Sequence, residues 1–123
     1  MPGKGSGDPR SGNLRNPAAA LFHPKRHMAI YEASVRTANA GSYLRKLCQH
    51  WSHRFEVQYD DQHGIILLPQ AKCVLTASPE TLLVRLACSQ GADGKRVQEV
   101  VEEHVRRFGF REELEFPWTP VGA

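Results

Sequence analysis

Five short runs of strand-like alternation and only two stretches of helical periodicity follow residue 29, and this order restricts the possible folds. The strand-like runs cover residues 30–37, 55–59, 65–68, 72–77 and 82–88. The helical stretches cover residues 43–54 and 95–108. The turns between the later strands are far shorter than the dozen or so residues that a parallel crossover needs. The sequence therefore predicts an α+β fold: an antiparallel four- to five-stranded sheet with both helices on one face, in the order strand, helix, four strands, helix.

Both predicted helices carry apolar side chains at three- and four-residue spacings. In the first helix these are Tyr43, Leu44, Leu47, Cys48 and Trp51. In the second they are Val97, Val100, Val101, Val105 and Phe108. Asn39 or Ser42 is expected to cap the first helix, and Gly109 to end the second. Each helix thus has one face to bury against the sheet.

Two helices cover only one face of such a sheet, so the other face meets solvent or a partner. We expect Leu83, Ala87, Ile66 and Leu68 on or near that open face, which suggests a homodimer formed through it. At the sheet's turns, Gly64 can adopt a positive φ. At the C-terminal end, residues 114–116 form a last short strand or, alternatively, belong to a docked tail anchored by Trp118.

The positive charge is concentrated before the predicted domain. Residues 1–28 hold five basic residues against one acidic residue, and the remainder holds 11 against 12. We predict a disordered basic tail over residues 1–28, a single domain over 29–119 and a C-terminal tail over 120–123. Met28 is an alternative start of the chain. Because the domain is nearly neutral, we do not expect it to bind nucleic acid.

No apolar run approaches the length of about 20 residues that a membrane-spanning helix needs, and the N-terminus lacks the apolar segment of a secretory signal. The three cysteines are widely spaced and odd in number, which is typical of a reducing compartment. We therefore expect a cytoplasmic protein without a membrane partner.

Three ordered blocks resemble a bacterial domain-of-unknown-function family, number 2218. They are a helix that reads YLRKLCQHWSHR over residues 43–54, a strand that reads CVLTA over 73–77, and a closing stretch that reads HVRRFGFREEL over 104–114. The resemblance spans residues 31–118 and brings no established activity. It implies a link to iron handling, with a siderophore-interacting reductase as partner.

His50 and His53 lie three residues apart on the first helix, so both imidazoles can reach one ion. His104 falls within the apolar face of the second helix and is expected to face His50. Together these residues are candidate ligands of iron or zinc. The alternative is that His104 hydrogen-bonds a buried group in the core while the other two are ordinary surface histidines.

Arg107, Arg111 and Glu112 form a second polar cluster, next to Phe108 and Phe110. Such a cluster can bind a carboxylate or a phosphate. The alternative is a surface ion-pair network that fastens the C-terminal segment, in which each exposed pair contributes little.

No motif of a standard enzyme is present: there is no G-x-S-x-G elbow, no phosphate-binding loop and no C-x-x-C pair. We therefore expect a non-enzymatic accessory module that binds a small ligand or metal. The alternative is a protein–protein interaction module with no bound cofactor. An enzyme would require strongly perturbed titratable groups that converge in a pocket.

Overall fold

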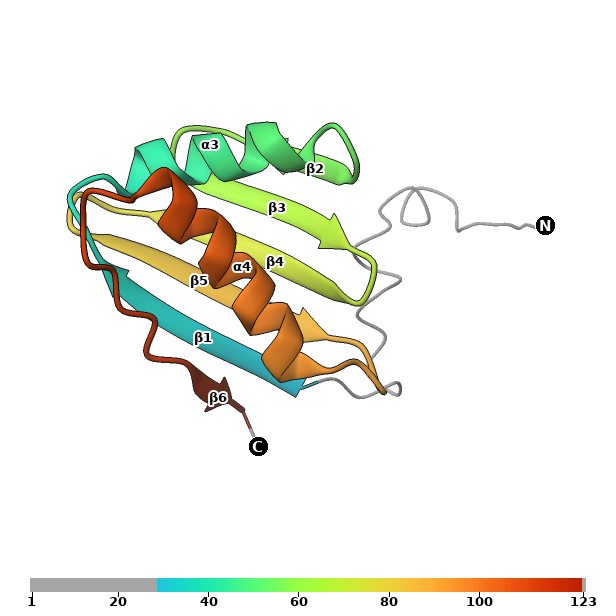
Figure 1. Cartoon of the computed structure of the whole chain (residues 1–123). Coiled ribbons are helices and arrows are strands. Elements are labelled where there is room, and N and C mark those ends of the chain that lie inside the picture. The colour runs from blue at the N-terminus through green and yellow to red at the C-terminus, as the bar shows by residue number, and fades with distance from the viewer. Residues whose placement is uncertain (1–28, 123) are drawn as a thin grey trace.

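The computed structural model describes residues 29–122, which form a six-stranded antiparallel sheet with two helices on one face (Figure 1). The strands are β1 (Ala29–Arg36), β2 (Glu56–Tyr59), β3 (His63–Leu68), β4 (Ala71–Ala77), β5 (Thr81–Cys88) and β6 (Thr119–Val121). The helices are α3 (Ala40–Trp51) and α4 (Gly94–Phe108). The spatial order is β2-β3-β4-β5-β1-β6. The predicted α+β class is confirmed, with more strands than the four or five expected.

The additional strand is β6, which pairs with β1 at one edge of the sheet. Residues 114–116 form no strand, so of the two alternatives the structure has the docked segment. Arg106 donates from Nη1 to the carbonyl oxygen of Leu114 at 2.6 Å, and its guanidinium lies 5.0 Å from the ring centre of Phe116. These contacts hold the segment against α4. Strand pairing begins at Thr119, so β6 extends into the predicted C-terminal tail over residues 120–123.

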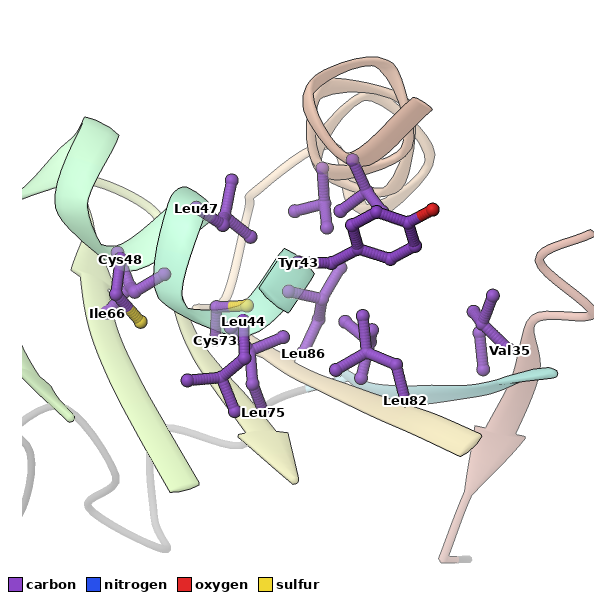
Figure 2. Packing of buried hydrophobic residues seen from close by; sticks show 14 of the residues in the cluster. Val35, Tyr43, Leu44, Leu47, Cys48, Ile66, Cys73, Leu75, Leu82 and Leu86 are labelled. Atoms are coloured by element: carbon purple, nitrogen blue, oxygen red, sulfur yellow. The ribbon is translucent and has the colours of Figure 1, made fainter. Parts of the chain in front are cut away.

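The core lies between the sheet and the two helices. Alternate residues of the central strands point toward the helices, and Figure 2 shows these side chains packed against those of α3. The largest fully buried residues are Leu44, Leu47, Ile66, Leu75, Leu82, Leu86, Val35, Val84, Val101 and Val105. Burial of this apolar surface is the main force that fixes both helices on one face.

Two of the four residues expected on the open face lie in the core instead. Ile66 is paired with buried Cys73 and points toward α3, and Leu68 belongs to the same cluster. Leu83 and Ala87 alternate with the core residues of β5 and do lie on the open face. Because side chains alternate along a strand, a one-residue error in register moves a residue to the opposite face.

Gly64 and Gly109 are required for close packing and not for positive φ. A Cβ at Gly64 would lie 2.8 Å from Cys48 Sγ, so the missing side chain lets α3 approach β3. A Cβ at Gly109 would lie 2.8 Å from the Tyr43 hydroxyl. Gly64 does not adopt the positive φ open to it, since only Gly91 and Gly122 have positive φ among the described glycines.

The predicted basic tail over residues 1–28, including Met28 as a start, lies outside the described residues.

The two helices differ in their N-terminal caps. Asp93 caps α4 by accepting a hydrogen bond from the Arg96 amide at 3.1 Å. Asn39 occupies the cap position of α3, but its side chain makes no capping bond there. Neither helix within residues 29–122 is long and apolar enough to cross a membrane.

Candidate functional site

A cavity of about 460 Å³ lies between the C-terminal end of α3 and the first half of α4, above the β3–β4 turn. We call it the interhelical cavity. Trp51, Phe55, Leu68, Val97 and Val100 supply apolar walls. Its polar lining comes from His50, Arg54, Gln70, Arg96 and His104. Small-molecule sites commonly combine a mostly apolar wall with a few polar groups in this way.

The structure brings His50 and His104 together across the two helices. Their ring centres lie 5.2 Å apart, and the His104 ring lies 4.8 Å from that of Trp51. His104 Nδ1 lies 2.7 Å from the carbonyl oxygen of Val100, one helical turn earlier. A neutral imidazole in this position donates from Nδ1, so Nε2 keeps its lone pair and can accept a hydrogen bond or bind a metal.

Positive groups gather at this cavity. None of the described residues that line it is acidic. Partial desolvation lowers the pKa of His50, and the nearby positive groups of His104, Arg107, His53 and Arg54 lower it further. An anion in the cavity would oppose that effect, because it favours the protonated imidazole.

His53 does not line the interhelical cavity and is exposed. Within residues 29–122, no group of three or more His, Cys, Asp or Glu side chains is arranged to hold a metal ion. Cys48 and Cys73 carry thiols of the kind that bind zinc, but both are fully buried in the core. Burial raises the pKa of the Cys48 thiol to about 11 and raises that of Cys73 as well.

Glu112, the acidic member of the second predicted cluster, is used inside the protein. Its carboxylate accepts hydrogen bonds from Thr37 Oγ1 at 3.0 Å, from Asn39 Nδ2 at 2.8 Å and from the Tyr43 hydroxyl. The bonds from Tyr43, Asn39 and Thr37 hold the pKa of Glu112 below its ordinary value. Glu112 therefore fastens the segment after α4 to the β1–α3 junction by hydrogen bonds, where an ion-pair network was the predicted alternative.

Arg107 and Arg111 are exposed and separate from the Glu112 network. Arg107 affects His50 electrostatically, and the Arg111 guanidinium lies 5.4 Å from the ring centre of Phe110. Arg111 and Glu112 also line a second cavity of about 380 Å³, beside α3 and the end of α4. The predicted cluster thus divides between two places.

Sequence reasoning did not identify Arg54, Phe55 and Arg96 as parts of the site. Arg54 and Phe55 lie in the turn after α3, and the apolar face that ends at Trp51 is the signal that could have pointed to them. Arg96 lies in the first turn of α4, and no local pattern in the sequence indicates that this turn faces the end of α3.

Comparison with known proteins identifies the family of this chain. The family described as "Uncharacterized protein conserved in bacteria (DUF2218)" matches residues 32–119. The NMR structure of PA4090 from Pseudomonas aeruginosa is 33% identical, with a TM-score of 0.65, and the alignment covers 78% of this chain and all of that one. The comparison with curated proteins gave no match. The chain therefore belongs to the DUF2218 family of uncharacterised bacterial proteins.

Proposed function

We propose that this domain binds a small organic anion with an apolar or aromatic body in the interhelical cavity. The observation that carries the proposal is the lining: apolar walls around a set of positive and imidazole groups, with no acidic residue among the described ones. An aromatic carboxylate would place its ring against Trp51 and its charge near Arg54 and His50. Each part of the ligand then meets a matching part of the protein.

The volume fits a ligand of this class. Pockets for drug-sized molecules measure about 300–1,000 Å³, and this one measures about 460 Å³. Arg54 lies over the edge of the cavity, with its guanidinium 5.9 Å from the ring centre of Phe55. It takes part in no carboxylate ion pair within residues 29–122, so its charge remains available to a ligand.

Calorimetry on the full chain tests the proposal with a matched pair of probes, 1-naphthoate and the neutral 1-naphthalenemethanol. We expect 1-naphthoate to bind about tenfold more tightly than the neutral probe, because its carboxylate gains about 1.4 kcal/mol from the cationic lining. Arg54→Gln should remove most of this preference. Val100→Phe should weaken binding of both probes, because the larger ring fills the cavity.

Arg36→Gln is the matched control, because Arg36 is exposed on the opposite face of the sheet. Equal affinity for the two probes would contradict an anion site. Binding that is unchanged in Val100→Phe would contradict this cavity as its location.

Binding of zinc or iron is a second candidate, supported by the 5.2 Å approach of His50 to His104 and by the Nε2 lone pair of His104. Zinc usually has four ligands, so the remaining positions would fall to His53 or to a bound anion. Elemental analysis of the purified chain tests it. A metal present near 1:1 should be lost in the double variant His50→Ala, His104→Ala. Purified protein that contains no metal, and whose Tm does not change when zinc or iron(II) is added, would exclude this candidate.

A role in iron or siderophore handling, with a siderophore-interacting reductase as partner, rests on the family resemblance. A homodimer through the open face is a proposal supported by Leu83 and Ala87, both of which lie there. Analytical ultracentrifugation of the full chain alone tests the homodimer. It should give twice the mass of one chain in the absence of any reductase, which the partner proposal does not require.

A further inference from the structure

Three cations beside the end of α4 are left outside the ion pairs of the described chain. The carboxylate pairs in which arginines take part use Arg45, Arg85, Arg96 and Arg106. Lys46, Arg107 and Arg111 take part in none of them, and all three are exposed. Exposed cations without acidic partners keep their full attraction for an incoming anion.

Two of these cations share a cavity with an exposed aromatic ring. Lys46 and Arg111 line the cavity of about 380 Å³ together with Phe108 and Phe110. Phe110 is 74% exposed, which is unusual for a phenylalanine in this domain. Arg107 directly precedes Phe108 at the end of α4. It is close enough to His50, which lies one turn after Lys46 on α3, to act on it electrostatically. We call Lys46, Arg107, Phe110 and Arg111 the cationic patch.

The nearest carboxylates are occupied by other partners. Glu112 accepts hydrogen bonds from Thr37, Asn39 and Tyr43. Glu103 lies one turn before Arg107, but its carboxylate is directed to Arg96 at 4.0 Å. Glu112 nevertheless stays ionised and lines the same cavity, so it offsets one of the three positive charges and leaves the patch with an excess of positive charge.

We propose that the cationic patch binds an acidic segment of a protein partner. One apolar side chain of that segment enters the cavity between Phe108 and Phe110, and flanking carboxylates pair with Lys46, Arg107 and Arg111. An aromatic anchor in a pocket, surrounded by charged groups, is the usual composition of a protein interface. The charge pattern favours a protein over nucleic acid, because residues 29–123 carry 11 basic and 12 acidic groups and the patch is short.

Fluorescence anisotropy on the full chain tests this with a labelled dodecapeptide of glutamates around one central phenylalanine. A peptide with glutamine in place of glutamate and a twelve-nucleotide thymidine oligomer serve as comparison probes. We expect the glutamate peptide to bind, and salt to weaken it. The double variant Lys46→Glu, Arg111→Glu should weaken binding by about tenfold or more, and Phe110→Ala by about threefold or more.

Arg36→Glu carries the same kind of charge change on the opposite sheet face and should leave peptide affinity unchanged. Equal binding of the glutamine peptide, or equal weakening by Arg36→Glu, would overturn the proposal. Tighter binding of the oligomer with the same variant dependence would assign the patch to nucleic acid instead. All three variants should retain 1-naphthoate binding, since none of the substituted residues lines the interhelical cavity, so the two proposals fail separately.

Discussion

At the scale of single residues, a few side chains hold the segments that frame the two cavities. Glu112 collects three donors from the β1–α3 junction, and Gly64 lets α3 approach the sheet. Neither residue is a ligand of the proposed anion. Both set the position of α3, and α3 contributes His50 and Trp51 to the interhelical cavity.

Glu112→Gln should lower the free energy of unfolding by about 1–3 kcal/mol at pH 7, because three donors lose a charged acceptor. Urea unfolding followed by circular dichroism measures the change. Since the folded pKa of Glu112 lies below its ordinary value, its stabilisation is present near neutral pH and is lost as the pH falls through the folded pKa. The difference between the two proteins should therefore shrink between about pH 5 and pH 3.

Glu113→Gln is the matched control for this experiment, since Glu113 is exposed and adjacent in sequence. It should change stability by less than about 0.5 kcal/mol. A difference for Glu112→Gln that stays constant down to pH 3 would contradict the assigned role of its charge.

Gly64→Ala should destabilise the domain by about 1–3 kcal/mol, because the new Cβ would lie 2.8 Å from Cys48 Sγ. The double variant with Cys48→Ala should recover part of that loss in a thermodynamic cycle, since the clashing sulfur is removed. Gly41→Ala is the control within α3, where the nearest side-chain atom is the flexible end of Arg45. If Gly64→Ala costs the same with and without Cys48, then the sulfur is not the obstacle.

At the scale of elements, periodicity predicted most of the fold. The helices and the long strands bury one face each, so their apolar residues repeat with the period of the structure. The run over residues 65–68 is apolar throughout, so the sequence could not assign Ile66 and Leu68 to a face. Their face is set by pairing with β4. Strand β6 has only three residues, including a proline, and therefore carries no strand signal.

The candidate site was predictable only in part. The angular positions of His50 and His104 on their helices predicted that the two would meet, and their rings lie 5.2 Å apart. Arg54 and Arg96 meet them because α3 and α4 cross above the β3–β4 turn. That crossing depends on long-range packing of the core, which no local pattern encodes.

The segment after α4 is a distinct element that is fastened to the helix by Trp118. Its indole donates from Nε1 to the Glu102 carboxylate, and its ring stacks on Phe116. Trp118→Phe keeps a ring but loses the donor, so it should lower the free energy of unfolding by about 1 kcal/mol or more. Hydrogen exchange should become faster over residues 119–121 and stay unchanged in α3. Equal acceleration in α3 would show that the segment and the helix open together.

At the scale of the whole molecule, the three cysteines report on the integrity of the core. Cys48, Cys73 and Cys88 are each no more than 1% exposed, and burial raises the pKa of every one of these thiols. Reaction with a disulfide reagent requires an exposed thiolate. In native buffer at pH 8 we therefore expect almost no thiol to react within minutes. In denaturant we expect all three thiols of each chain to react. Rapid native reaction would contradict this packing of the core.

The central claim is that the cavity between α3 and α4 is the ligand site of this domain. Titration of the ¹⁵N-labelled full chain with 1-naphthoate, followed by NMR, tests it most directly. We predict saturable shifts of the Trp51 indole N–H and of the amides at Arg54, Val97, Val100 and His104, with residues of the open sheet face unchanged. Shifts confined to the open face or to Phe110 and Arg111, or no saturable shift at all, would contradict the claim.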